Sequence, residues 1–412
     1  MDRGRHRLPA GLTVGVLRAG QVFDGERLTG PGEVRWEGDR LTLVGAPETG
    51  RAVEGQGAGG GRREPCLELP AGWTVAPGFV DVHCHGGGGA AFTEGAEAVR
   101  RAVGTHRRAG TTSVMASTVT APLPALREQL AVLGEAVVEG DLLGVHLEGP
   151  WLAPGKAGAH DPGLLRAPDV AEFDAMQAAA GGTVRMVTVA PEPSGGEELV
   201  RHLAERGVVA AVGHTEATLE EARRALGAGA SAFTHLFNAM RPLHHREPGP
   251  VLTALQDDRA WVELIADGVH LAPDVLGWAL RALGERAVLV SDAMAAAGAP
   301  DGDYRLGSLD VRVEAGVARL APGDGDAGGG AIAGSTLTLE RAVRFAIEGA
   351  GVEPVAALRA ATSAPAAMVG AADVGHLRPG AWADLVVLDA GWTVRGVLRH
   401  GQWVRPREVP GA

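Results

Sequence analysis

The sequence predicts an α/β protein, a (β/α)8 TIM barrel with a small β-sandwich domain built from both chain ends. Apolar, β-branched runs alternate with segments rich in Ala, Glu and Arg through the middle of the chain, a pattern typical of alternating strands and helices. Histidines and acidic residues stand at the ends of several of these runs, where a barrel of this kind places its chemistry. The 412 residues also exceed one barrel of about 250 residues, so a second unit is expected.

Eight barrel strands are predicted in chain order. They are Phe79–Val82, Thr112–Met115, Leu142–Leu147, Val184–Ala190, Val208–Val212, Ala232–Thr234, Trp261–Ala266 and Ala287–Ser291. Helix-forming segments such as Glu97–Arg108 and Glu216–Leu226 separate them. Because the carboxyl ends of barrel strands share one face, we expect the residues at these ends to lie close together.

The two ends of the chain alternate short strand patterns with glycine turns. The predicted strands are Val14–Leu17, Gln21–Val22, Glu33–Trp36, Leu41–Val44, Ala383–Asp389, Val394–His400 and Val404. We therefore assign residues 1–76 and 378–412 to the small β-sandwich domain and residues 77–377 to the barrel. Glycine-rich loops are expected at Gly55–Gly61 and Gly323–Gly330; the second follows a predicted hairpin (Leu309–Val313, Val317–Leu320), where a mobile lid and an idle surface loop both remain open.

Composition indicates a soluble globular enzyme, with 45% hydrophobic and 21% charged residues. We expect a cytoplasmic protein, because no apolar run approaches the length of a membrane span and the basic segment Met1–Pro9 lacks the apolar core of a signal peptide. A net charge of −12 argues against nucleic acid or an anionic membrane as partner. Cys66 and Cys84 fall in different predicted units, which favours reduced thiols.

Residues at the strand ends form a candidate metal centre. Side chains alternate along a strand, so His83 and His85 point the same way and form a ligand pair. The other candidates at strand ends are Glu148, His214, His235 and Asp292. The only lysine, Lys156, lies in a loop, so Glu148 must replace the carboxylated lysine that bridges many two-metal barrels. A lone histidine is more often structural, but four histidines and two carboxylates at strand ends together indicate a metal-dependent hydrolase. One or two divalent ions are expected, and Zn²⁺ or Fe²⁺ suits these ligands best.

Eight motifs occur in a fixed order along the chain. They are Pro77–His85, His146–Leu152, Val187–Glu192, Gly213–Thr218, Thr234–Met240, Ile265–His270, Ser291–Ala293 and Ile332–Ser335. This set resembles that of the N-acetylglucosamine-6-phosphate deacetylases in the amidohydrolase superfamily. The His-x-His pair marks only the superfamily, whereas His-Leu-Glu-Gly-Pro and Thr-His-Leu-Phe-Asn-Ala-Met are more specific.

The resemblance implies the chemistry of the centre. Glu148, His214 and His235 would hold the primary metal. His83 and His85 would complete a second position that some members lose, so two ions are favoured here. Asp292 would take a proton from the attacking water and deliver it to the departing amine. The products would be glucosamine 6-phosphate and acetate.

The resemblance also implies a set of substrate contacts. His160 would polarise the acetyl carbonyl, and Arg246 would clamp the phosphate from the neighbouring subunit, which implies a homodimer. The other implied contacts to the phosphorylated amino sugar are Ala159, Asn238, Ala239, His270, Ile332, Ala333 and Gly334. An ordinary solvated arginine is the alternative for Arg246.

Three further functions stay open. The residues Met294 and His244-His245 depart from the family pattern near the pocket, so N-acetylgalactosamine 6-phosphate is an alternative substrate. Another amidohydrolase acting on a C–N bond would keep the metal residues without needing Asn238 and Arg246. A non-catalytic scaffold with this fold is less favoured, because such relatives typically lose a ligand or the aspartate and this chain has both.

Overall fold

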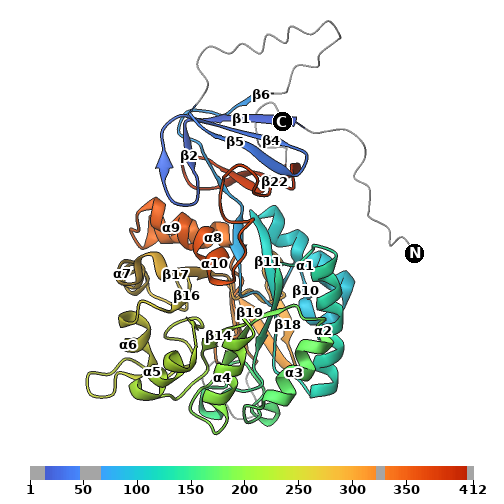
Figure 1. Ribbon diagram of the computed structural model, residues 1–412, viewed down its shortest axis with the longest axis vertical. Helices are drawn as coiled ribbons and strands as arrows, with labels where there is room; N and C mark the ends of the chain where they lie inside the picture. The colour runs from blue at the N-terminus through green and yellow to red at the C-terminus, as the bar shows by residue number, and fades with distance from the viewer. Residues whose placement is uncertain (1–13, 47–65, 322–329, 406–412) are drawn as a thin grey trace, which may run out of the picture.

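The computed structural model describes residues 14–46, 66–321 and 330–405. Eight parallel strands pair side by side to form a nearly closed barrel (Figure 1). In order around the barrel they are β8 (Phe79–Asp81), β11 (Thr111–Thr118), β12 (Gly144–Glu148), β13 (Val184–Val189), β14 (Val209–Val212), β15 (Ala232–Phe233), β16 (Trp261–Ile265) and β17 (Ala287–Val290). All eight predicted strands are present, so the predicted barrel is confirmed.

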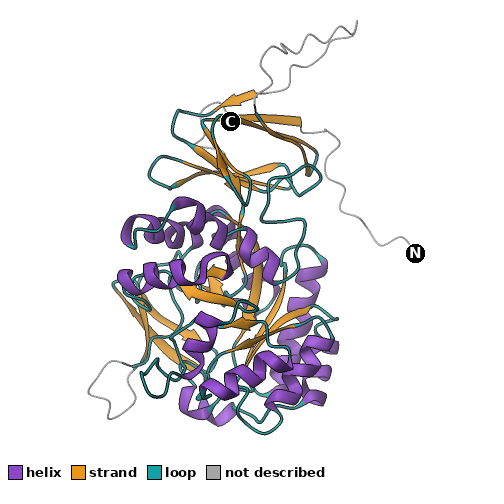
Figure 2. Ribbon diagram, turned by 60° about the vertical axis from the view of Figure 1, so that its left-hand side comes forward, coloured by secondary structure: helices purple, strands orange, loops and turns teal. Residues whose placement is uncertain are grey.

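Helices surround these strands on the outside (Figure 2). They are α1 (Ala96–Arg108), α2 (Leu123–Val138), α3 (Val170–Ala179), α4 (Gly196–Glu205), α5 (Leu219–Ala228), α6 (Gly249–Gln256), α7 (Pro273–Leu283), α8 (Leu339–Arg344), α9 (Pro354–Ala360) and α10 (Ser363–Met368), with a π-helical turn at Phe345–Gly349. Every residue of β11 and β12 is buried, which explains the continuous apolar runs of these strands. The helix predicted from Glu216 begins at Leu219 instead, because Thr218 and Glu221 form a capping box.

The barrel closes at the carboxyl ends of its first and last strands. The named strands β8 and β17 are not paired in the sheet, but the chain just beyond them is. The backbone N–H of Asp292 donates to the carbonyl of His83 at 2.9 Å, and that of His85 donates to the carbonyl of Ala293 at 2.8 Å. The closing hydrogen bonds therefore join the two segments that carry candidate site residues.

Two further sheets are built from both ends of the chain and lie beside the barrel (Figure 2). One contains β5 (Arg40–Gly45), β4 (Gly32–Glu37), β1 (Val14–Ala19) and β6 (Cys66–Glu68); the other contains β23 (Gln402–Arg405), β22 (Val394–Arg399), β21 (Leu385–Leu388), β7 (Thr74–Pro77), β2 (Gln21–Phe23) and β3 (Leu28–Thr29). Leu17 and Trp36 of the first sheet share a buried apolar core with Val75 and Leu385 of the second. The expected sandwich is present, while its exact boundaries at residues 76 and 378 stay predictions.

A small antiparallel sheet follows the last barrel strand. It contains β18 (Gly302–Leu306), β19 (Leu309–Glu314) and β20 (Val317–Leu320), so the predicted hairpin is confirmed and gains a third strand. The short strands β9 (Gly86–Gly87) and β10 (Ala90–Ala91) form a separate pair. The predicted loop Gly55–Gly61 lies outside the described residues, as does nearly all of Gly323–Gly330, so the lid is not tested. In the described ranges, no helix has the length and apolar character needed to cross a bilayer.

Candidate metal and substrate site

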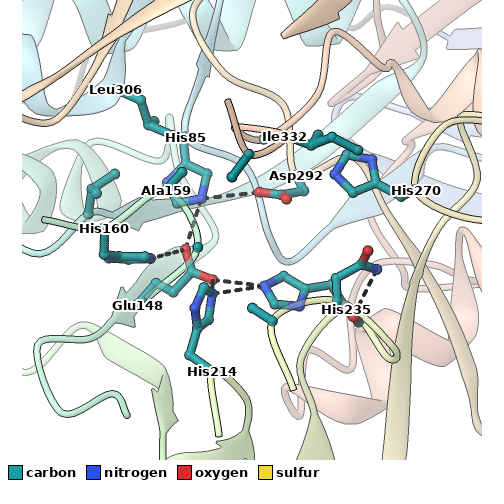
Figure 3. A pocket seen from close by; sticks show the side chains of 16 residues that line it. His85, Glu148, Ala159, His160, His214, His235, His270, Asp292, Leu306 and Ile332 are labelled. Atoms are coloured by element: carbon teal, nitrogen blue, oxygen red, sulfur yellow. Dashed lines mark hydrogen bonds and ion pairs between the residues drawn. The ribbon is translucent and has the colours of Figure 1, made fainter. Parts of the chain in front are cut away.

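Six predicted site residues converge at the carboxyl end of the barrel, and five of them are labelled in Figure 3. Each follows or ends a strand: His83 and His85 follow β8, Glu148 ends β12, His214 follows β14, His235 follows β15 and Asp292 follows β17. All six side chains are buried. The barrel topology thus brings together residues that are more than 200 positions apart in the sequence.

Glu148 lies at the centre of this cluster. Its Oε1 is 3.2 Å from Nε2 of His214 and 3.2 Å from Nε2 of His235. Its Oε2 is 3.1 Å from Nε2 of His85, which in turn is 3.2 Å from Oδ1 of Asp292. Nε2 of His83 also lies 3.4 Å from Oε1, so the carboxylate of Glu148 contacts all four candidate ligand histidines.

The hydrogen bonds of His214 fix which of its nitrogens carries the hydrogen. Its Nδ1 lies 2.8 Å from the carbonyl oxygen of Lys156, which can only accept. In the neutral ring, Nε2 is therefore a lone pair, and it faces Nε2 of His235 at 3.1 Å. Two imidazole nitrogens at this separation need a proton or a metal ion near them, so these residues fit a divalent ion.

His83 shows the same arrangement, with a partner on Nδ1 and a second histidine at Nε2. Its Nδ1 lies 2.9 Å from Oε2 of Glu263, and its Nε2 lies 3.3 Å from Nε2 of His85. Burial lowers the pKa of His85, but hydrogen bonds to Asp292 and Glu148 outweigh burial and raise that pKa to about 9. A metal ion would compete with this proton for the same lone pair.

His160 lies beside the cluster but differs from the ligand histidines. The backbone N–H of Thr120 donates to its Nδ1 at 3.2 Å, so Nδ1 is the lone pair and the hydrogen is on Nε2. That Nε2 lies 3.4 Å from Oε2 of Glu148. Burial lowers the pKa of His160 to about 4, which keeps the ring neutral. Although His160 stands within ligand distance of Glu148 and His214, this tautomer makes it a hydrogen-bond donor and not a ligand.

A cavity of about 230 Å³ opens above the cluster. The predicted substrate residues that line it are Ala159, His160, Asn238, Ala239, His270, Ile332 and Gly334. Ala333 does not line it, because its side chain is buried in the core of the β18–β20 sheet. A hydrogen bond to Asp267 outweighs burial and raises the pKa of His270, which favours a positive charge at the cavity wall.

Arg246 and Asn238, the predicted side-chain contacts to phosphate, are engaged with other residues of this chain. Arg246 lies in an exposed loop, donates to Nε2 of His245 at 2.7 Å and does not line the cavity. The NH2 group of Asn238 donates to the carbonyls of His235 and Leu236 at 3.1 and 3.2 Å, and it must leave them to bind phosphate.

The sequence reasoning missed two residues that hold the site. Thr120 sets the tautomer of His160, and Glu263 bonds to His83. Glu263 had a signal, since it is the one charged residue in the buried run Trp261–Ile265. The structure also marks the predicted site residues in a way that the sequence cannot. His214, His235 and Asp292 all have positive φ angles (48°, 27° and 47°), and backbone strain of this kind clusters at functional sites.

A second buried group, Asp81, Cys84 and His106, lies behind the ligand pair. Nε2 of His106 is 2.8 Å from the carbonyl oxygen of Gly86, so this nitrogen carries a hydrogen and is not available to a metal. A Cβ atom on Gly87 would lie 2.8 Å from the same nitrogen. The glycines of this segment therefore allow close backbone packing behind His83 and His85.

Known proteins resemble this chain over most of its length. The profile of the amidohydrolase family matches residues 74–404. An N-acetylgalactosamine-6-phosphate deacetylase from Escherichia coli O157:H7 is 40% identical over 334 residues, which cover 80% of this chain and 87% of that protein. An N-acetylglucosamine-6-phosphate deacetylase from Bacillus subtilis (strain 168) is 38% identical over 287 residues, which cover 68% of this chain and 71% of that protein. A solved structure from Mycobacterium smegmatis, a variant of N-acetyl-D-glucosamine-6-phosphate deacetylase in complex with N-acetyl-D-glucosamine-6-phosphate, is 44% identical with a TM-score of 0.87 and covers 95% of this chain and 100% of that one.

Proposed function

This chain belongs to the amidohydrolase family, and we propose that it removes the acetyl group from N-acetylglucosamine 6-phosphate to give glucosamine 6-phosphate and acetate. One observation carries the proposal: a buried cluster of ligand atoms around Glu148 lies between a carboxylate, Asp292, and a neutral donor, His160. The relatives confirm the predicted resemblance and the predicted class of enzyme, an amide-hydrolysing deacetylase.

The donor set fits one or two divalent ions, with Zn²⁺ and Fe²⁺ as the proposed metals. Glu148, His214 and His235 would hold one ion, and His83 with His85 would hold the other. When bound, such an ion polarises the acetyl group and lowers the pKa of water to about 7.

Asp292 and His160 supply the proton chemistry on either side of the acetamide. Asp292 accepts a proton from the attacking water and delivers it to the amine nitrogen as the C–N bond breaks. His160 donates its Nε2–H to the acetyl oxygen, where negative charge develops as water adds to the carbon. Because Thr120 fixes that hydrogen on Nε2, the donor is in place before the substrate arrives.

A homodimer would complete the phosphate site. Arg246 is exposed and outside its own cavity, which is compatible with service to the neighbouring subunit. Four large apolar side chains are exposed in segments that lie close in sequence to the cavity residues Ala239 and His270. They are Leu243 (43%), Val269 (39%), Val275 (36%) and Trp278 (43%). Trp278 also contacts Phe237, which precedes the cavity residue Asn238. A second copy on this face would cover these side chains and bring its arginine to the phosphate.

The test is acetate release from a panel of N-acetylhexosamines, each with and without a 6-phosphate. We expect turnover of the 6-phosphates and little turnover of the free sugars, with Asp292→Asn as the inactive control. Equal turnover of phosphorylated and free sugars would exclude a phosphate clamp. No acetate release by the Zn²⁺- or Fe²⁺-loaded protein would overturn the proposal.

N-acetylgalactosamine 6-phosphate is the second candidate substrate, because the Escherichia coli relative of that specificity is 40% identical to this chain. The ratio of kcat/KM for the two epimers in the same panel decides between them.

We also propose the cytoplasm as the compartment, a location compatible with the free thiols of Cys66 and Cys84.

A further inference from the structure

We propose that Glu263 is a positioning residue that builds the metal position formed by His83 and His85. This inference rests on the proposed function, since it takes these two histidines as ligands. Glu263 lies in β16 and is fully buried. Its Oε2 is 2.9 Å from Nδ1 of His83 and also accepts the backbone N–H of His235 at 3.2 Å.

The burial of this carboxylate is costly for a purely structural residue. Its other oxygen, Oε1, has no hydrogen-bond partner among the described residues. A buried acidic side chain is costly unless it is well paired, and apolar residues of similar volume in place of buried ionic groups are often neutral or stabilising. The position of Glu263 is therefore better explained by what it does to His83.

The bond to Glu263 prepares His83 to bind a metal. It holds the hydrogen on Nδ1 and leaves the Nε2 lone pair directed at His85 and Glu148. It also fixes the orientation of the imidazole ring and makes Nε2 more basic, as second-layer carboxylates do in other metal sites. Because the same oxygen holds the backbone of His235, Glu263 links a ligand of each metal position.

The histidines of the two proposed metal positions differ in the partner of their Nδ1 atom. Nδ1 of His214 meets a neutral carbonyl, and Nδ1 of His85 and of His235 has no partner among the described residues. Within the described part of the chain, only His83 among these four has a carboxylate on Nδ1. The His83 position therefore receives the anionic partner, and its ion should depend on Glu263 more than the other ion does.

Charge balance points the same way. Two divalent ions bring four positive charges into this buried space, and Glu148, Asp292 and Glu263 bring three negative ones. Removing the charge of Glu263 leaves more of that positive charge unbalanced. Repulsion between buried charges is weakly screened, so the second ion to bind bears most of the cost.

The experiment compares Glu263→Gln with a direct ligand loss and a remote control. The direct loss is the double variant His83→Asn, His85→Asn. The control is Asp384→Asn, which changes a buried carboxylate at the opposite end of the barrel strands, where its oxygen accepts the backbone N–H of His400. Metal content is measured after dialysis against a weak chelator, and binding is followed by the visible absorption of added Co²⁺.

We expect the wild type and Asp384→Asn to bind two ions, and Glu263→Gln to bind its second ion about 10- to 100-fold more weakly with the first unchanged. In Glu263→Gln, excess Co²⁺ should restore the absorption change that accompanies binding of the second ion. Recovery of this kind is expected from a positioning residue and not from damage to the fold. If the glutamine variant does not fold, Glu263→Met repeats the test, because methionine fills a similar volume with an apolar side chain.

Three outcomes would contradict the inference. Two ions bound to Glu263→Gln or Glu263→Met with wild-type affinity would overturn the role of Glu263 and leave the metal centre intact. Equal weakening of both ions would overturn its selectivity for the His83 position. Unchanged metal content in the His83→Asn, His85→Asn variant would instead overturn the assignment of the ligands, and with it the proposed two-ion centre.

Discussion

At the scale of single residues, the partner of one ring nitrogen decides what each histidine of the site can do. His214 donates from Nδ1 to a carbonyl and presents a lone pair to the cluster, whereas His160 accepts at Nδ1 and presents a hydrogen. The sequence predicted His214 from its place at a strand end, and His160 only through the family resemblance. It could not predict their tautomers, because Thr120 and Lys156 reach them from 40 and 58 positions away.

His160→Phe separates the donor role from a ligand role. The substitution keeps a ring in the space but removes the Nε2–H, so we expect unchanged metal content and a fall in kcat of about 10²- to 10³-fold. Metal analysis and steady-state kinetics on one preparation check this. Glu148→Gln is the matched control and should lose metal and activity together. Loss of metal from His160→Phe would show that His160 is a ligand after all.

Asp292→Asn tests the proton carrier. Asparagine keeps the size of the side chain but cannot accept and return a proton, so turnover should fall by about 10² or more while the substrate still binds. Substrate binding to the variant is measured directly, by calorimetry with the metal-loaded protein. A kcat near that of the wild type would mean that another group moves the proton, and His270 at the cavity wall would be the first to examine.

At the scale of elements, strand existence was predictable and strand pairing at the chain ends was not. The barrel strands are local apolar runs, and their order around the barrel follows the order in the sequence. By contrast, β7 pairs with both β2 and β21, and the partner β21 lies about 300 residues away. No local pattern specifies such a partner, and β7 had no strand prediction of its own.

The free energy of unfolding should depend on pH through Asp384. This residue precedes β21 and accepts the backbone N–H of His400, which follows β22. Burial raises the pKa of this carboxyl from 3.8 to about 6. The folded state therefore binds more protons than the unfolded state between these values, and stability falls as pH rises through this window. The wild type should lose roughly 1 kcal/mol from this group between pH 5 and 7.5.

Asp384→Asn should remove this loss, because asparagine does not titrate. Urea unfolding of both metal-loaded proteins at the two pH values gives the difference. A variant whose stability changes with pH as the wild type's does would show that Asp384 is not the titrating group.

At the scale of the whole molecule, the sequence predicted which residues converge at the carboxyl end of the barrel, whereas the role of Arg246 came only from the resemblance. Ligands on strand ends had to converge once the barrel closed. Arg246 lies in a loop, where no periodic pattern fixes its place, and the structure puts it outside the cavity of its own chain. Whether the arginine serves a neighbour is a property of two chains, and the sequence suggested it only through resemblance.

Mixing two impaired variants, with the 6-phosphate substrate held well below the KM of Arg246→Ala, tests this arrangement. Arg246→Ala alone should raise KM for the 6-phosphate substrate steeply, since losing a charged hydrogen-bonded contact costs about 2–5 kcal/mol, and should barely affect the free sugar. In a heterodimer of Arg246→Ala with Asp292→Asn, one site would combine an intact Asp292 with the partner's intact arginine. Random exchange in a two-fold dimer should then restore about one quarter of wild-type activity. No recovery, despite subunit exchange demonstrated by mass spectrometry, would place Arg246 in its own chain's site or outside the reaction.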